Sequence, residues 1–170
     1  WRAVREFYKP FDLVTTPTKT TEKLLRENGV PNTFVVPNGI NLGKFSPKND
    51  GSVMRKALNL SSSDKIVLSA GRLSYEKNVD VIIRAAQLVL EEQDAVFVVQ
   101  GDGPAREKCE RLARQLRVAD NFVFTGFVKD FEVPYFYAAA DTFVTASTFE
   151  TQGLALLEAM ASGAVCVGAK

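Results

Sequence analysis

The feature that most constrains the fold of this chain is a regular alternation of short apolar runs with helical patterns from residue 65 onward. The apolar runs lie at residues 66–70, 96–99, 122–124, 142–145 and 165–170. Between the first two runs, Val79, Ile82, Ile83 and Ala86 recur with the period of an amphipathic helix. Continuous apolar strands separated by helices of this length indicate βαβ units. The predicted fold class is therefore α/β, with a parallel sheet covered by helices on both faces.

The first forty residues are organised differently. They contain predicted helices over 1–8 and 18–27 and predicted strands over 13–15 and 34–36. Residues 41–64 lack a regular period except at 53–58 and contain Pro47, Gly51 and three successive serines, which is the composition of a linker. We therefore predict a boundary near residue 45. Residues 1–45 would be the tail of one α/β domain, and residues 46–170 a second domain that is truncated at its C-terminus.

Composition narrows the chemistry. The 170 residues include no histidine, two cysteines, and 21 Lys plus Arg against 20 Asp plus Glu. Balanced charge argues against a nucleic-acid partner, and the lack of histidine excludes Ser-His pairs, Cys-His pairs and HExxH zinc sites. Cys109 and Cys166 lie in apolar patterns and are predicted to be reduced core residues of a cytoplasmic protein. No apolar run reaches the ~18–20 residues of a membrane span. A chain that begins at Trp1 is expected to be part of a longer one.

Candidate functional residues follow the predicted strands, because ligands of open parallel sheets bind at the carboxyl ends of the strands. Glycine-containing loops stand there at 71–77, 101–104, 126–129 and 147–153. Arg72, Lys77 and the N-terminus of a helix beginning at Gly153 would form a phosphate site without a metal ion. The alternative is that the cations are surface charges and the glycines only form turns. For the Gly-Asp-Gly sequence at 101–103 alone, the turn interpretation is favoured.

Two glutamates complete the set of candidates. Glu158 is the only charge on a predicted helix over 153–162 that is apolar nearly all round and is therefore expected to be buried. A buried carboxylate needs partners, either an ion pair with Arg or Lys or hydrogen bonds from the hydroxyls of a sugar or ribose. Glu150 would lie roughly 10 Å from Glu158. This exceeds the ~5–5.5 Å of a retaining glycosidase, so a hydrolase is not favoured.

Together these motifs resemble the C-terminal, nucleotide-sugar-binding half of GT-B retaining glycosyltransferases of family 4, also called glycosyl transferases group 1. The matching segments, in the order typical of the family, are 36–40 with Phe45 and Pro47, 71–78, 101–104, 126–128, and the Glu-x7-Glu motif of Glu150 and Glu158. The resemblance implies a Rossmann-like domain, preceded by the tail of the N-terminal, acceptor-side domain.

The resemblance also implies how the charged residues act. Arg72 and Lys77 would bind the donor diphosphate and replace a metal ion in stabilising the leaving nucleotide. Glu150 would bond the hydroxyls of the transferred sugar and position the donor, with retention of configuration. The donor would be a UDP- or GDP-hexose, and no metal or other cofactor is implied.

The other donor-binding residues follow from the same resemblance. The main-chain N–H groups of Gly153 and Leu154 would contact sugar or phosphate. Glu158 would hold the ribose diol. The main chain of Phe127 and Val128 would meet the nucleobase.

Two residues depart from the family pattern. Gln152 stands where Phe or Tyr is common, and the sequence of 150–154 is similar to that of glycolipid-forming members, which points to a lipid acceptor. A polysaccharide and a small molecule remain alternative acceptors. Asn78 stands where Gly is common after the lysine. The full-length enzyme is expected in the cytoplasm, at the inner face of the membrane if its acceptor is a lipid.

Other functions remain as alternatives. The chain has no Asp-x-Asp triplet, so the metal-dependent glycosyltransferase architecture has no support. A nucleotide-sugar epimerase of the same architecture and a non-catalytic nucleotide-sugar-binding module are the alternatives to a transferase. A nicotinamide dehydrogenase ranks last, because the glycines at 101–103 follow the second strand and lack the third glycine. By itself this fragment is expected to bind donor but to transfer little or nothing.

Overall fold

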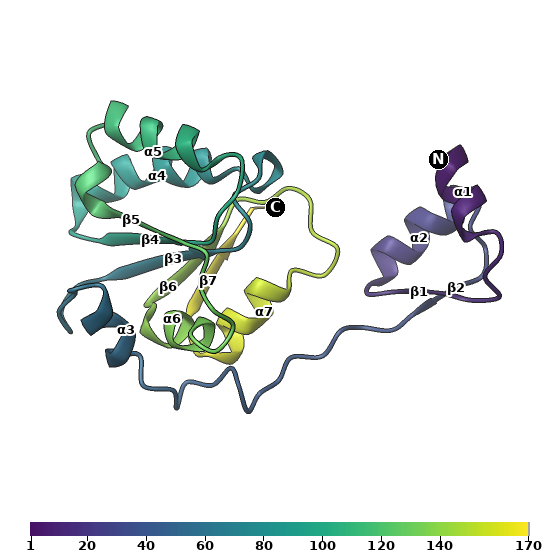
Figure 1. Ribbon diagram of the computed structural model, residues 1–170, viewed down its shortest axis with the longest axis horizontal. Coiled ribbons are helices and arrows are strands. Elements are labelled where there is room, and N and C mark those ends of the chain that lie inside the picture. The colour runs from purple at the N-terminus through teal and green to yellow at the C-terminus, as the bar shows by residue number, and fades with distance from the viewer. Residues whose placement is uncertain (170) are drawn as a thin grey trace. The chain divides into compact units, whose positions relative to one another are not determined.

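The computed structural model describes residues 1–169 and divides into two compact units. The first unit contains residues 1–39 together with 150–154, and the second contains the rest of the chain. Figure 1 shows both units, with colour running along the chain. Lys170, the last residue of the predicted closing strand, lies outside the described residues.

The first unit contains two helices and a pair of parallel strands. They are α1 (Arg2–Tyr8), β1 (Val14–Thr16), α2 (Lys19–Glu27) and β2 (Thr33–Val35). Helix α2 begins after Thr18, whose Oγ1 accepts a hydrogen bond from the N–H of Thr21 at 3.2 Å. All four predicted elements are present, with the two strands displaced by one residue from their predicted positions.

The second unit is built on a five-stranded parallel sheet in the order β5-β4-β3-β6-β7. Its strands are β3 (Ile66–Ala70), β4 (Val96–Gln100), β5 (Phe122–Gly126), β6 (Thr142–Thr145) and β7 (Val165–Gly168). The chain runs outward from β3 through β4 to β5 and then returns to the other side of β3 as β6. This reversal places a topological switch point between β3 and β6, where open α/β sheets bind ligands.

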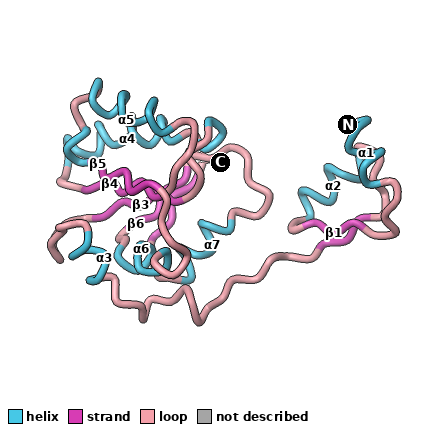
Figure 2. The backbone as a smooth tube through the Cα atoms, in the orientation of Figure 1, coloured by secondary structure: helices cyan, strands magenta, loops and turns pink. Residues whose placement is uncertain are grey.

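Helices cover both faces of this sheet. They are α3 (Ser52–Ala57), α4 (Val79–Glu92), α5 (Arg106–Gln115), α6 (Val133–Ala139) and α7 (Leu154–Ala161), with 3-10 turns η1 (Tyr75–Lys77) and η2 (Ala119–Asn121). Helices α4 and α5 lie on one face, and α3, α6 and α7 lie on the other (Figures 1 and 2). The predicted α/β fold, a Rossmann-like parallel sheet with helices on both faces, is confirmed.

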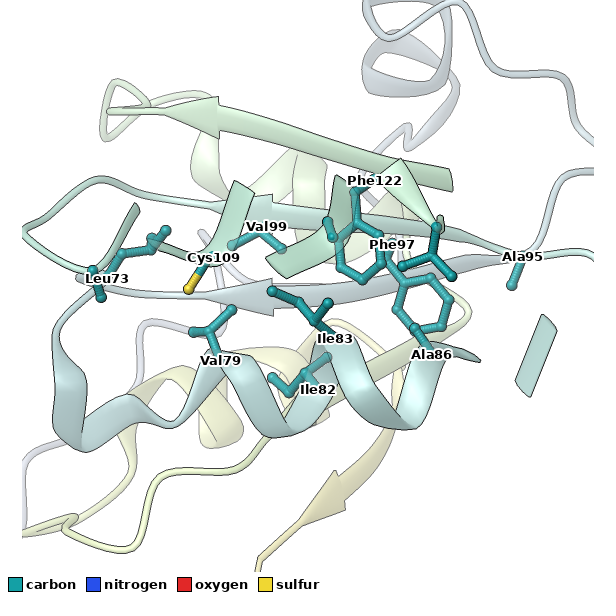
Figure 3. Packing of buried hydrophobic residues seen from close by; sticks show 13 residues of the cluster. Leu73, Val79, Ile82, Ile83, Ala86, Ala95, Phe97, Val99, Cys109 and Phe122 are labelled. Atoms are coloured by element: carbon teal, nitrogen blue, oxygen red, sulfur yellow. The ribbon is translucent and has the colours of Figure 1, made fainter. Parts of the chain in front are cut away.

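The core under α4 and α5 follows the helical period read from the sequence. Ile83 and Ala86 of α4 are completely buried, and the rings of Phe97 and Phe122 on neighbouring strands stack 5.0 Å apart. Figure 3 shows these side chains between α4 and the sheet. Cys109 is buried in the same cluster. Burying such side chains contributes roughly 1.5–3 kcal/mol for each large one, which holds the sheet that carries the site.

The opposite face corrects one prediction about α7. The helix was expected to be buried all round, but only its Ala159 is fully buried and Met160 is 59% exposed. Ala155, Leu156 and Ala159 pack against the cluster around Tyr137 and Phe143, so the helix contacts the core with one side. An apolar helix that packs through one side leaves its remaining apolar residues outside the core.

Candidate functional site

The predicted site residues belong to both units. Arg72, Lys77, Phe127, Val128 and Glu158 are in the second unit. The second group, Glu150, Gly153 and Leu154, is in the first unit. The separation of roughly 10 Å predicted for the two glutamates stays a prediction.

The loop after β3 carries the two candidate cations. Arg72 has a side chain that is 75% exposed, and its Nη2 lies 3.9 Å from Glu76 Oε1, at the outer limit of an ion pair. Glu76 also accepts a 2.6 Å hydrogen bond from the Ser74 hydroxyl, which lowers the pKa of its carboxyl. Lys77 closes η1 and is half-buried. Arg72 therefore has a loosely held charge that an anionic ligand could engage.

The loops after β3 and β4 interlock through their main chains. The N–H of Leu73 donates to Asp102 O and the N–H of Ala105 donates to Leu73 O, both at 2.9 Å. A Cβ on Gly101 would lie 2.0 Å from the carbonyl oxygen of Gly71, and one on Gly103 would lie 2.4 Å from that of Leu73. These glycines are needed for the close approach of two backbones, which supports the turn interpretation. Their effect is to hold the segment that carries Arg72.

The conformation and contacts of Asn78 explain why asparagine can stand where glycine is common. Its φ is +48°, a left-handed conformation that glycine adopts easily and that asparagine tolerates better than most residues. Its Nδ2 donates to Ala146 O at 3.1 Å, which a glycine could not do. The residue therefore keeps the turn into α4 and also links the loop after β3 to the loop after β6.

The segment after β5 presents unpaired main-chain groups. Gly126 ends β5 with a φ of +70° and accepts a hydrogen bond from Gly101 N at 3.0 Å. Phe127 is 85% exposed, whereas Val128 packs partly against the core cluster on the α6 side. Within residues 1–169, no main-chain hydrogen bond of Phe127 or Val128 is present. Their N–H and C=O groups are therefore available for hydrogen bonds with the edge of a planar ligand.

Glu158 lies on α7 and is partly buried. Its Oε2 accepts a hydrogen bond from the Tyr137 hydroxyl on α6 at 2.9 Å. Burial raises the pKa of the Glu158 carboxyl, and the Tyr137 hydrogen bond and the charge of Lys44 oppose that rise. Across the described part of the chain, Glu158 forms no ion pair with Arg or Lys. Of the two kinds of partner expected for this carboxylate, the structure therefore contains a hydroxyl and not a cation.

The contact with Tyr137 was missed by sequence reasoning. The two residues are 21 positions apart and lie on different helices. Tyr137 stands in an apolar stretch, where its ring is indistinguishable from an ordinary core residue. The unexplained carboxylate of Glu158 was the only signal, and it did not identify the partner.

In the first unit, the segment 150–154 is fastened to the chain that follows β2. Gln152 Oε1 accepts from both the main-chain N and the Nδ2 of Asn38 at 2.9 Å, and Gln152 Nε2 donates to Asn38 O at 2.7 Å. The Thr18 hydroxyl donates to Thr151 O at 3.1 Å. An amide is required for the paired contacts with Asn38, which an aromatic residue at 152 could not make. Gly153 has a φ of +71° before α7 begins.

Two further features are absent from residues 1–169. None of the helices in this range combines the length and the apolar character that crossing a membrane requires. The same range contains no group of three or more Cys, Asp or Glu residues placed to hold a metal ion.

Comparison with known proteins identifies the family. The model of the family "Glycosyl transferases group 1" matches residues 52–170. The chain belongs to this family. The resemblance to glycosyl transferases group 1 stated from the sequence is thereby confirmed.

Curated members of the glycosyl transferases group 1 family align with nearly all of the chain. An alpha-monoglucosyldiacylglycerol synthase of Streptococcus pneumoniae is 39% identical over 166 residues, which is 94% of this chain and 38% of that protein. A GDP-mannose-dependent alpha-(1-6)-phosphatidylinositol dimannoside mannosyltransferase of Mycobacterium tuberculosis is 34% identical over 92% of this chain and 40% of its own length. The chain thus spans about two fifths of these relatives.

A solved structure supports the fold independently. The Anabaena protein Alr3699/HepE, in complex with UDP and glucose, superposes with a TM-score of 0.88 at 23% identity. The superposition covers 99% of this chain and 47% of that protein. At this level of identity the likeness establishes the shared fold.

Proposed function

We propose that this chain forms the donor-binding part of a glycosyltransferase that transfers a hexose from a UDP- or GDP-sugar to an acceptor hydroxyl, with retention and without a metal ion. Residues 46–170 would be the donor domain. Residues 1–45 would be the tail of the acceptor-side domain and the linker. Catalysis would require the rest of that domain, so the 170 residues alone would bind donor and transfer little.

The observation that carries this proposal is a set of groups on the second unit, in the loops after β3 and β5 and on α7. Arg72 offers an exposed cation, Phe127 and Val128 offer unpaired main-chain groups, and Glu158 offers a carboxylate whose Oε1 has no partner among residues 1–169. These suit in turn the diphosphate, the base and the ribose diol of one nucleoside diphosphate. They lie on the second unit, whose strand order places the switch point between β3 and β6.

The proposed reaction uses these residues as follows. The bond between the sugar C1 and the oxygen of the β-phosphate breaks, and the acceptor oxygen forms a bond to C1 on the same face. The proton of the acceptor hydroxyl passes to the leaving phosphate. Arg72 and Lys77 stabilise the charge that develops on that phosphate, and Glu150 positions the sugar through its hydroxyls, with Gly153 and Leu154 contributing N–H groups.

The acceptor is proposed to be a glycolipid or its lipid precursor. Supporting observations are the names of the two curated relatives, both of which refer to lipids. The Gln152 contacts with Asn38 show that the departure at this position has a defined structural role. The full-length enzyme would then work in the cytoplasm at the inner face of the membrane.

Ligand-induced stabilisation tests the donor proposal. UDP, GDP and their hexose conjugates are each added to the purified protein in a thermal melt, with uridine and ADP as comparison ligands. At a ligand concentration of 100 Kd the free energy of unfolding rises by about 2.7 kcal/mol, which shifts Tm measurably. If neither UDP, GDP nor any of their sugars stabilises the protein in the melt or binds in calorimetry, the proposal is wrong.

A further inference from the structure

The hydroxyl of Tyr137 is the only group within residues 1–169 that forms a hydrogen bond with the side chain of Glu158. Tyr137 is 1% exposed, and its ring packs edge-on against Phe45 at 5.7 Å and tilted against Phe143 at 5.8 Å. Packing on both sides of the ring restricts the positions that its hydroxyl can take. The oxygen is therefore a fixed donor that points to Glu158.

The direction of this hydrogen bond is set by the surroundings of both groups. Burial raises the pKa of Tyr137, and the adjacent Glu158 carboxylate raises it further. The phenol therefore keeps its proton and donates, while the carboxylate accepts. A hydrogen bond to a charged acceptor is stronger than one between neutral groups, so it fixes the Glu158 rotamer more firmly.

Packing alone does not explain the hydroxyl. A phenylalanine would fill the same space between Phe45 and Phe143 without burying a polar atom. A neutral acceptor on α7 would satisfy a tyrosine at lower cost than a partly buried carboxylate does. The pairing of Tyr137 with Glu158 is therefore better explained by a use for the carboxylate than by a need of the core.

We propose that Tyr137 is a positioning residue for nucleotide binding. By holding Oε2 of Glu158, its hydroxyl orients the carboxylate so that Oε1 accepts hydrogen bonds from the ribose diol. This inference rests on the proposed function, because it concerns the same nucleoside diphosphate site. Tyr137 itself touches no ligand and acts only through Glu158.

The test compares two ligands that differ only in the diol. Calorimetry measures the affinity of the wild type and of Tyr137→Phe for UDP and for 2′,3′-dideoxyuridine diphosphate, and GDP with its dideoxy analogue is used if the protein prefers guanine. Tyr137→Phe removes the hydrogen bond that orients Glu158, and the less well oriented carboxylate should bind the ribose diol more weakly. We expect the affinity for UDP to fall by about tenfold. Binding of the dideoxy analogue should change by less than about twofold, because the diol that Glu158 would hold is absent.

A matched control comes from the same helix. Tyr135→Phe removes a hydroxyl for which no hydrogen bond is found in the described part of the chain, and it should leave both affinities unchanged. Glu158→Gln keeps an acceptor for Tyr137. In that background Tyr137→Phe should reduce UDP affinity by less than about twofold, because the two residues act in series. Near-UV circular dichroism and Tm show that each variant is folded.

The outcomes separate this inference from the proposed function. If the wild type binds no nucleotide, the proposed function fails and this inference fails with it. If the wild type prefers UDP to the dideoxy analogue but Tyr137→Phe keeps that preference, only the positioning role is overturned. Equal weakening of both ligands by Tyr137→Phe also overturns it, because a purely structural defect would not depend on the diol.

Discussion

Asn78 Nδ2 donates a 3.1 Å hydrogen bond to the carbonyl oxygen of Ala146, 68 residues further along the chain. The bond joins the loop after β3 to the loop after β6 across the topological switch point of the sheet. It also connects the turn that follows Lys77 to the segment that leads toward Glu150.

The first prediction concerns the two properties of Asn78. Asn78→Gly keeps the left-handed turn but loses the hydrogen bond, and it should lower the free energy of unfolding by about 1 kcal/mol. Asn78→Ala loses the bond and strains a φ of +48°, and it should cost about 2 kcal/mol. Urea unfolding measures both. Equal stability of the Ala and Gly variants would show that the backbone conformation at 78 carries no strain.

The second prediction concerns the interlocked loops. A Cβ at Gly101 would lie 2.0 Å from Gly71 O, at a φ of +123°. Gly101→Ala should therefore lower the free energy of unfolding by at least about 2 kcal/mol, because backbone atoms have to move apart. Gly39→Ala is the control, since nothing lies within 4 Å of its added Cβ. A Gly101→Ala variant that melts at the wild-type temperature would contradict the close approach.

The third prediction concerns Arg72 and the diphosphate. Arg72→Ala should weaken binding of UDP by at least about tenfold, as expected for the loss of a charged hydrogen bond, and should leave uridine binding unchanged. Arg84→Ala removes an exposed arginine from α4 and serves as the control. Calorimetry at two salt concentrations measures the effect. A similar loss of uridine and UDP binding would mean that Arg72 acts on the fold and not on the phosphates.

The fourth prediction concerns pH. Burial raises the pKa of Glu158 above its ordinary value of 4.5, while Tyr137 and Lys44 oppose the rise and Asp130 adds to it. Only the ionised carboxylate accepts from both ribose hydroxyls. The preference for UDP over its dideoxy analogue should therefore decline as the pH falls from 7 through this raised pKa. Because both ligands carry the same diphosphate, the ratio of their two affinities is unaffected by protonation of the phosphates.

The Glu158 carboxyl should affect the stability of the fold in the opposite direction: ionisation favours binding of the diol but disfavours folding. Because the pKa of Glu158 is raised in the folded state, its contribution to stability is present at low pH and is lost as the pH rises through that pKa. Glu158→Gln should consequently raise Tm at pH 7 while it removes the preference for the diol. Melting curves from pH 4 to 8 measure this. A variant whose Tm falls at neutral pH would indicate that the carboxylate stabilises the fold.

Much of the fold could be predicted because local patterns decide it. The helical period at Ile82, Ile83 and Ala86 identifies the buried side of α4, and continuous apolar strands identify a sheet covered on both faces. Strand limits in the first unit were displaced by one residue, since hydrogen bonding of the partner strand sets them. The burial of α7 was overestimated because an apolar composition does not reveal which side of a helix packs.

The candidate site could be proposed from the sequence only as a set of residue types. Glycines, cations and carboxylates after parallel strands could be found by position alone. Their partners could not, because Tyr137 and Glu158 meet through the packing of two helices, and Leu73 meets Asp102 through the paths of two loops. Such contacts depend on tertiary geometry that no local spacing encodes.

The interlock of the loops after β3 and β4 has a consequence for how this domain can diversify. Leu73 is held through its main-chain N–H and carbonyl oxygen, which every residue except proline supplies in full. The path of the loop is therefore largely independent of the exposed side chains of Arg72 and Tyr75. Point substitutions at these positions can alter the chemistry offered to a ligand while the scaffold beneath them stays in place.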